Sequence, residues 1–237
     1  MPFFWPARGH AQSTADAPHG LSSQGVGIGI GMIGQAMDPA ARICTYRGPS
    51  VEGFEHFVAV ALEEEGLVVC SGVKFAVKRQ TRRTTKEEQT HGYEVDLVGA
   101  RSDKLVLATV KSFFGSLGVQ SKEVTGAGGK TTGYMLLNDP VIRDGVVQAA
   151  ADRYGYDVSQ VHLRLYAGKW ATTRTRDDRQ ITTEWCSQQI VGAGPIEVYG
   201  VDEVVSLVRK VAARKTYLND PVIVAMKVLA EAGALKA

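Results

Sequence analysis

Acidic and basic side chains recur at short spacing between residues 94 and 111. Glu94-Val-Asp96 lies within one apolar run, and Thr109-Val-Lys111 closes the next one. Because side chains alternate along a strand, Glu94 and Asp96 are expected on one face, as are Thr109 and Lys111. Two neighbouring strands would then bring Asp96 and Lys111 within a few ångströms of each other.

This combination suits the hydrolysis of a phosphodiester. Carboxylate and carbonyl oxygens hold hard divalent cations, which stabilise charge on the phosphate and generate hydroxide near neutral pH. A lysine is a compact cation that orients the attacking water and assists its deprotonation. The pattern therefore predicts a site that uses Mg²⁺ or Mn²⁺ as its cofactor.

The elements that must position these side chains begin near residue 50. Apolar residues at helical spacing from Phe54 to Leu62 predict a helix that ends at Gly66. The expected elements are then strands over 67–77, 93–98 and 105–110, a helix over 140–154, strands over 161–166 and 195–199, a helix capped by Asp202, and a last helix running to near Leu235. We expect an α/β fold with a central mixed sheet, a helix-strand-strand-strand-helix-strand core and flanking helices.

Three motifs follow this element order: Gly53-Phe54-Glu55, Glu94-Val-Asp96 and Thr109-Val-Lys111, with thirteen residues from Asp96 to Thr109. The set resembles the PD-(D/E)xK nuclease superfamily, and within it the Mrr-type restriction endonuclease and Holliday-junction resolvase-like branch. The resemblance covers residues 51–114 closely and extends by element order to about 212. It implies a restriction-endonuclease-like fold and a divergent, Mg²⁺-dependent endodeoxyribonuclease.

The resemblance also implies a role for each residue. Asp96 would be the principal metal ligand, the Val110 carbonyl a further ligand, Lys111 the catalytic lysine and Glu55 a supporting acid. The sequence departs from the family at Thr109, where the family has an acid, and a neutral hydroxyl is a much poorer Mg²⁺ ligand than a carboxylate. Our hypothesis is that Glu94, as a catalytic residue and metal ligand, replaces the missing acid.

DNA is the partner that this activity implies. Before the second predicted strand lies a basic stretch that could contact phosphates: Lys78, Arg79, Arg82, Arg83 and Lys86. A second basic segment contains Arg174, Arg176 and Arg179, near Trp170 and Trp185, whose rings could stack on bases. His91 precedes a glycine in a loop, and we expect it to be exposed. Cutting both strands of a duplex needs two sites, which is an argument for a homodimer.

Composition separates the two ends from the middle. We expect a low-complexity, disordered leader over 1–48, a nuclease-like domain over 49–214 and a C-terminal helical extension over 215–237. Met37 could be the biological start. The hexapeptide Leu-Asn-Asp-Pro-Val-Ile opens a predicted helix at both 137–142 and 218–223, which we interpret as a shared way of starting a helix.

Two glycine-rich segments imitate nucleotide-binding motifs. Gly29-x-Gly31-x-x-Gly34 has neither the preceding strand nor the following helix that a dinucleotide site needs. Gly129-Lys-Thr has Val124 where a phosphate-binding loop requires glycine. We expect residues 115–133 to be a flexible or DNA-contacting loop, too polar for a core element.

The whole-chain figures exclude several protein classes. The 237 residues are 44% hydrophobic, which excludes a fully disordered chain, and the net charge of +2 is too small to argue for nucleic acid by itself. Three widely spaced cysteines fit neither a disulfide framework nor a zinc site, so we expect reduced thiols in a cytoplasmic protein. No apolar run reaches the length of about 20 residues that spans a membrane, so we expect no membrane partner.

Three functions therefore remain open. The first is a metal-dependent DNA nuclease. The second is a nuclease-fold module that binds nucleic acid and has lost cleavage through Thr109. The third is a structural or interaction protein in which Asp96 and Lys111 form only an ion pair.

Overall fold

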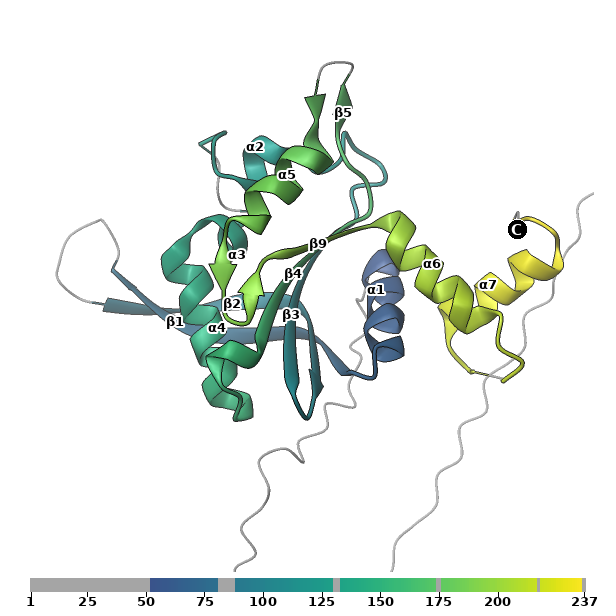
Figure 1. Ribbon diagram of the computed structural model, residues 1–237, viewed down its shortest axis with the longest axis horizontal. Coiled ribbons are helices and arrows are strands. Elements are labelled where there is room, and N and C mark those ends of the chain that lie inside the picture. The colour runs from purple at the N-terminus through teal and green to yellow at the C-terminus, as the bar shows by residue number, and fades with distance from the viewer. Residues whose placement is uncertain (1–51, 81–87, 130–132, 174–175, 217, 236–237) are drawn as a thin grey trace, which may run out of the picture. The chain divides into compact units, whose positions relative to one another are not determined.

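The computed structural model describes residues 52–80, 88–129, 133–173, 176–216 and 218–235. It is a mixed α/β structure built on a five-stranded sheet of order β1-β2-β3-β4-β9 (Figure 1). Strands β1, β2 and β3 pair antiparallel, whereas β3, β4 and β9 pair parallel. The predicted mixed sheet with flanking helices is confirmed at this level.

The elements of the first half follow directly from local sequence. They are α1 (Gly53–Glu64), β1 (Val68–Gln80), β2 (Glu88–Arg101) and β3 (Lys104–Lys111). The α1 helix buries its apolar stripe and stops before Gly66, whose φ of +81° is accessible to glycine at little steric cost. The three strands are consecutive in sequence, and the connections between them are too short for the crossover that a parallel pair needs, so they pair antiparallel.

The second half adds the parallel strands and most of the helices. Its elements are α2 (Ser121–Val124), α3 (Met135–Asn138), α4 (Pro140–Tyr154), the 3₁₀ turn η2 (Val158–Gln160), β4 (Val161–Ala167), β5 (Thr172–Thr173), β6 (Arg176–Asp177), α5 (Asp178–Ser187), β7 (Ile190–Val191), β8 (Gly194–Pro195), β9 (Glu197–Gly200), α6 (Val201–Ala212) and α7 (Pro221–Glu231). The α4 helix supplies the crossover between the parallel strands β3 and β4.

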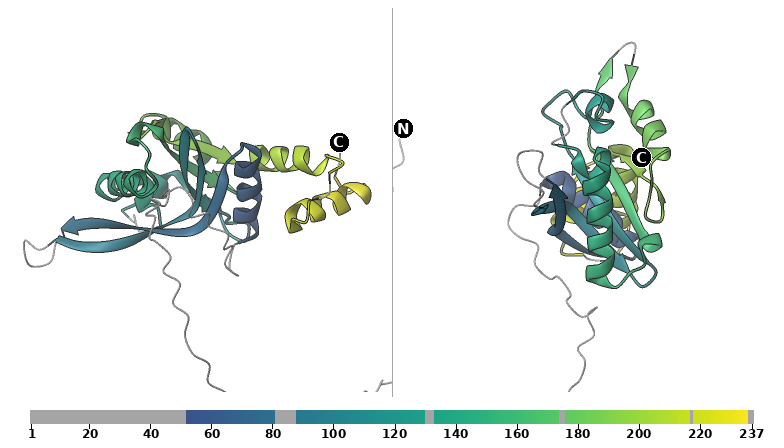
Figure 2. Two further views of the ribbon diagram at one scale, coloured as in Figure 1. Left: turned by 90° about the horizontal axis from the view of Figure 1, so that it is seen from below. Right: turned by 90° about the vertical axis from the view of Figure 1, so that its left-hand side faces the viewer.

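Helices cover both faces of the sheet (Figure 2). One apolar core contains side chains of α1, α6 and α7, for example Val58, Val208 and Ile223. The other core contains side chains of α4 and α5, such as Val146 and Cys186. Burial raises the pKa of the Cys186 thiol to about 12, so this cysteine stays protonated, in agreement with the predicted structural thiol.

The repeated hexapeptide produces the same helix start twice. The Asp139 side chain accepts hydrogen bonds from the backbone N–H groups of Val141 and Ile142 at the start of α4. Asp220 accepts the equivalent bonds from Val222 and Ile223 at the start of α7. The interpretation as a shared helix start is thus confirmed, because in both copies aspartate caps and proline occupies the first turn.

Three sequence expectations need correction. Gly200, not Asp202, precedes α6, and its N–H donates to the Glu203 carboxylate at 2.8 Å. The last helix ends at Glu231, short of Leu235. The segment 115–133 is not wholly outside the core, because it contains α2 and buries Val119, Ser121 and Val124.

A two-stranded arm extends from the sheet. Residues 88–96 of β2 pair only with β1, since the pairing of β2 with β3 begins at Leu97. The α4 helix packs along this arm, and Gly145 of α4 leaves space for Val77 of β1. A Cβ atom on Gly145 would lie 2.5 Å from Val77 Cγ1, so the glycine is required for this contact.

Candidate functional site

Asp96 lies where β2 and β3 separate. The last residue pair of their ladder is Leu97 with Ala108, one step before Asp96. Beyond it the Asp96 side chain takes over as acceptor: the Val110 N–H donates to Asp96 Oδ2 at 2.6 Å. The carboxylate therefore satisfies a backbone donor of β3 that would otherwise have no acceptor on β2.

Two further side chains contact the same oxygen, Asp96 Oδ2. The Thr109 hydroxyl donates to Asp96 Oδ2 at 3.1 Å, and Lys111 Nζ lies 3.8 Å from it. Each of the Asp96 and Lys111 side chains is 23% exposed, so the pair faces solvent in part. Oδ1 of Asp96 has no hydrogen-bond donor within the described part of the chain. The predicted meeting of Asp96 and Lys111 is present in the structure.

Regular alternation of side chains fails at Asp96. Val95 packs in the core on the α4 side and Leu97, two residues later, in the core on the α1 side. Gly72, which lies opposite Asp96 in the register of β1 and β2, has a φ of +64°. This local change of twist removes the simple basis for placing Glu94 and Asp96 on one face.

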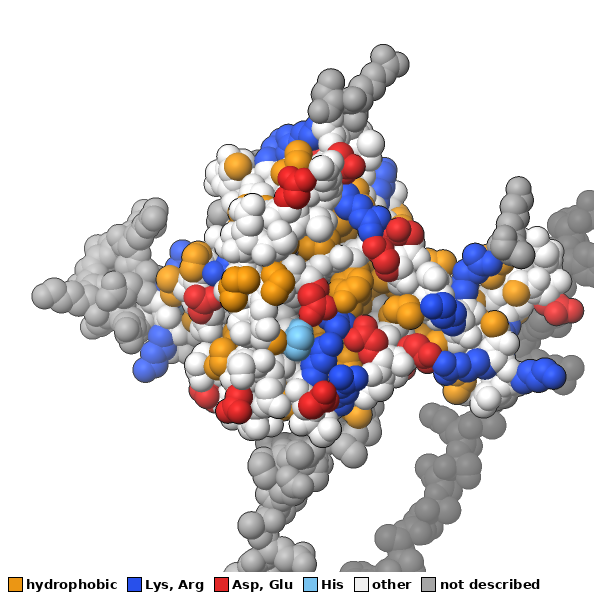
Figure 3. Space-filling model, viewed as in Figure 1, with side chains coloured by type: hydrophobic (Ala, Val, Ile, Leu, Met, Phe, Trp, Pro, Cys, Tyr) orange, Lys and Arg blue, Asp and Glu red, His pale blue; other side chains and the backbone are white. Residues whose placement is uncertain are grey.

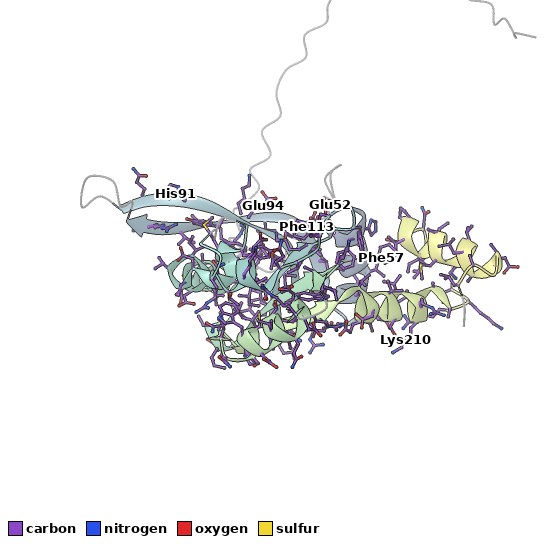
Figure 4. All side chains as sticks on the ribbon, turned by 90° about the horizontal axis from the view of Figure 1, so that it is seen from above. Glu52, Phe57, His91, Glu94, Phe113 and Lys210 are labelled. Atoms are coloured by element: carbon purple, nitrogen blue, oxygen red, sulfur yellow. The ribbon has the colours of Figure 1, made fainter. Side chains whose placement is uncertain are left out.

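Glu94 has a different neighbour. It is exposed, and its carboxylate lies 3.4 Å from Lys74 across the arm. Figure 4 shows Glu94 on the arm, with the exposed His91 farther toward its end. The structure thus brings together Asp96, Thr109, Val110 and Lys111, but it gives Glu94 a partner on β1. Replacement of the missing acid by Glu94 stays a prediction.

Glu55 is positioned by the first turn of α1. Burial raises its pKa, and the negative charges of Asp96 and Glu52 raise it further, against a smaller opposing effect of Lys111. Asp96 is thus close enough to act on Glu55. Glu52 in turn accepts a hydrogen bond of 2.8 Å from the Ser112 hydroxyl, directly after β3. The start of α1 and the end of β3 are therefore joined at this site.

Tyr134 was not identified from the sequence. It is buried, and Lys111 Nζ lies over its ring, 5.9 Å from the centroid. Burial and, to a lesser extent, Glu123 raise the pKa of its hydroxyl, so the residue is neutral. A single tyrosine in a glycine-rich segment gave no signal, because only the fold brings it under the lysine.

The carboxylates of Asp96 and Glu55 are oxygen donors of the kind that Mg²⁺ and Mn²⁺ prefer. A divalent cation beside them would relieve the repulsion that raises the pKa of Glu55. Within the ranges that the structure describes, no three His, Cys, Asp or Glu side chains form a group that could hold a metal ion. The remaining ligands would have to be the Val110 carbonyl and water, since the Thr109 hydroxyl is used as a donor to Asp96.

The predicted DNA-contacting residues are placed only in part. Lys78 is exposed on the arm, and Arg79 forms an ion pair of 3.2 Å with Asp139. Arg82, Arg83 and Lys86 lie outside the described residues.

The second basic segment is also placed only in part. Trp170 and Trp185 are partly buried against the core on the α4 side, and Arg176 and Arg179 form ion pairs with acids of this same chain. Contact of this segment with nucleic acid stays a prediction. Arg174 lies outside the described residues.

A separate polar cluster is formed by residues of β4 and β9 together with Glu65, which directly follows α1. The Arg164 side chain is only 3% exposed, and its guanidinium contacts the carboxylates of Glu65 and Glu197 at 2.9 Å each. His162 Nδ1 and the Tyr199 hydroxyl also contact Glu197, at 2.8 and 2.7 Å. Figure 3 shows basic, acidic and histidine side chains next to one another over this part of the sheet. We refer to these five residues as the Arg164 cluster.

A cavity of about 370 Å³ adjoins the Arg164 cluster. Its walls include Tyr166, Tyr199, Glu65, Leu207 and Lys210. The rings of Tyr166 and Tyr199 are stacked, with centroids 4.9 Å apart. No residue of the sequence-predicted site lines this cavity, so it is distinct from the surroundings of Asp96.

Comparisons with protein-family models, with curated proteins and with solved structures found no match. No described helix has the length and apolarity needed to cross a membrane.

Proposed function

We propose that this chain is a divergent metal-dependent DNA nuclease of the PD-(D/E)xK type, with a restriction-endonuclease-like arrangement of its sheet and helices. The observation that carries the proposal is the meeting of Asp96 and Lys111 from two neighbouring strands, 3.8 Å apart at the point where those strands separate. Glu55 from α1 supports it, because burial and then the negative charge of Asp96 raise its pKa, which places a second carboxylate near the first.

Each residue has a specific task in this proposal. Asp96 and Glu55 would hold Mg²⁺ or Mn²⁺, together with the Val110 carbonyl. When bound, the cation supplies charge stabilisation for the phosphate and a water of lowered pKa. Lys111 orients the attacking water and helps to remove its proton, and the Tyr134 ring holds the ammonium group near Asp96. The N–H of Val110 keeps the Asp96 carboxylate fixed through Oδ2 and leaves Oδ1 to the cation.

A second candidate is a nuclease-fold module that binds DNA without cutting it. Thr109 favours this alternative, because its hydroxyl donates to Asp96 where the family has a carboxylate ligand. Removing one carboxylate from such a site weakens its attraction for a divalent cation. Both candidates bind DNA, and only the first cleaves it.

The decisive experiment measures cleavage of linear, circular and branched DNA by the whole chain in Mg²⁺ and in Mn²⁺. We expect Asp96→Ala and Lys111→Ala each to lower the rate by at least about 100-fold. Asp103→Ala is the matched control, because Asp103 is an exposed acid at the opposite end of β3 and should leave the rate unchanged. Equal loss in all three variants, or none in the first two, would refute the proposed site.

A Thr109→Glu substitution separates the two candidates. If the parent cleaves DNA, the added carboxylate should lower the Mg²⁺ concentration needed for half-maximal cleavage. If the parent only binds DNA, the same variant is the one expected to gain cleavage. Thr109→Val, which removes the hydroxyl without adding a ligand, is the control for both measurements.

A further inference from the structure

The residues that follow Lys111 expose a group of large apolar side chains. Phe113 is 37% exposed, Phe114 57% and Leu117 76%. They lie within a short loop, residues 112–118, that we call the aromatic loop. Apolar side chains grouped on a surface and next to polar functional residues are typical of a binding site.

The aromatic loop is held in a fixed conformation. Lys169 Nζ donates to the Ser116 carbonyl at 2.6 Å, and the Gly168 N–H donates to the Lys111 carbonyl at 2.8 Å. A Cβ atom on Gly168 would lie 2.7 Å from the Phe114 ring, so this glycine makes room for the phenylalanine. These contacts fix the conformation of the aromatic loop with its phenylalanine rings partly exposed.

Phe113 has an unfavourable backbone conformation. Its φ of +48° makes it the one described residue other than glycine in the left-handed region. A bulky residue there costs free energy that asparagine or glycine would largely avoid. Phe113 thus occupies a position where glycine or asparagine would make the fold more stable. This indicates that the phenylalanine ring has a role in binding.

The aromatic loop adjoins the proposed nuclease site. Ser112 donates to Glu52 at the start of α1, and the Phe114 ring packs edge-on against Phe54 with centroids 5.5 Å apart. Figure 4 shows Phe113 near Glu52. Phe54 precedes Glu55 in sequence, and Lys111 precedes Ser112. A ligand that stacks on Phe113 would therefore continue directly toward Asp96 and Lys111.

We propose that the aromatic loop stacks on the bases of an unpaired DNA strand, so that the preferred substrate carries unpaired nucleotides next to the phosphate to be cut. The inference rests on the proposed function and names its substrate class. In a duplex the faces of the bases are covered by their neighbours, whereas unpaired bases offer them to aromatic rings. Lys169, which donates to the Ser116 carbonyl of the loop, and Lys111, which directly precedes the loop, supply positive charge for the backbone of such a strand.

A protein partner fits this surface less well. A stable interface removes about 800 Å² of each partner from solvent. Two partly exposed phenylalanines and one leucine provide only a fraction of that area. The size of the patch matches one or two bases.

The test measures binding in EDTA, where cleavage cannot interfere, of single-stranded, duplex and flapped oligonucleotides that carry 2-aminopurine. We expect the unpaired probes to bind more tightly than the duplex and their fluorescence to be quenched on binding. Phe113→Gly should weaken binding of the unpaired probes between about fivefold and 100-fold. This variant removes the ring and also relieves the positive φ, so its melting temperature should be equal or higher.

Leu229→Ala on α7 is the control, because it removes an exposed apolar side chain far in sequence from the loop. Equal affinity for duplex and unpaired probes, or binding unaffected by Phe113→Gly, would overturn the inference. So would a loss of self-association in Phe113→Gly, measured by sedimentation, in place of a loss of DNA binding. Stacking without cleavage in Mg²⁺ would refute only the nuclease activity, and cleavage without stacking would refute only the role of the loop.

Discussion

The Arg164 cluster and the Asp96 site lie on the same sheet and differ in how their charges are balanced. In the Arg164 cluster a nearly buried cation faces two carboxylates: Glu65 also lies 4.0 Å from Lys104 Nζ, and Glu197 also contacts a histidine and a tyrosine. At the Asp96 site two carboxylates act on each other, and the three donors all address one oxygen. The comparison teaches that balanced charges fit a structural cluster, whereas surplus negative charge is what the proposed cation site requires.

The largest effect on stability is expected at Arg164. Arg164→Met leaves Glu65 and Glu197 without their guanidinium, and we expect the free energy of unfolding to fall by about 3 kcal/mol, the lower end for a broken buried ion pair. Urea denaturation followed by circular dichroism measures it. Arg101→Met is the control, since its ion pair with Asp103 is exposed and its loss should lower the free energy of unfolding much less. Equal losses in both variants would remove the distinction.

A smaller, pH-dependent effect is expected at Glu197. Burial by itself would raise its pKa, but the hydrogen bond from Tyr199 and the charges of Arg164 and His162 outweigh burial and lower it. A lowered pKa stabilises the fold above the ordinary value near 4.5, and this stabilisation is lost as the pH falls through the pKa of the folded state.

Glu197→Gln should therefore cost about 1–2 kcal/mol at pH 7 and almost nothing in acid below the lowered pKa of the folded state. Denaturation at the two pH values tests the sign. A difference that stays constant between them would show that Glu197 acts by packing alone.

At Glu55 we expect a pH dependence of stability opposite in sign to that at Glu197, and the smallest effect of the three. Its raised pKa means that its favourable contribution is present below about pH 4.5 and is lost as the pH rises through the pKa of the folded state. At pH 7 Glu55→Gln should raise the melting temperature, by the equivalent of less than about 1 kcal/mol because the side chain is partly exposed. The same variant should lower DNA cleavage.

Mg²⁺ sharpens this last measurement. Addition of Mg²⁺ should raise the melting temperature of the parent chain, since a ligand that binds the folded state stabilises it. This Mg²⁺-induced increase in melting temperature should be smaller in Glu55→Gln than in the parent chain. In Arg101→Met it should equal that of the parent. A stabilising Glu55→Gln variant that responds to Mg²⁺ like the parent would place the cation elsewhere.

Local physical chemistry was sufficient to predict most of the elements. The apolar stripe of α1, the aspartate caps at 139 and 220, and the strands β1 to β4 each depend on neighbours in sequence. The meeting of Asp96 with Lys111 could be predicted too, because it needs only two adjacent strands. Its further neighbours could not, since Tyr134 and Glu55 come from separate helical segments.

The failures have physical reasons of their own. Alternation along a strand holds only while the twist is regular, and at Asp96 it breaks opposite Gly72. A charged residue in an alternating strand is expected on the solvent-facing side, and Arg164 in β4 is such a residue. In the structure, however, helices cover that face of the sheet, and the negative charge that balances Arg164 comes in part from Glu65, 99 positions earlier.

Gly145 also determines how the β1–β2 arm is aimed. Residues 88–96 extend the arm by about 30 Å at the usual rise of a strand, and Val77 contacts α4 partway along it. Arg79, two residues farther along β1, forms an ion pair with Asp139 at the start of α4, and Arg153 of α4 donates to the Lys74 carbonyl, so the helix holds the arm at several points. The absence of one methyl group in a helix thus sets how closely the arm lies against α4.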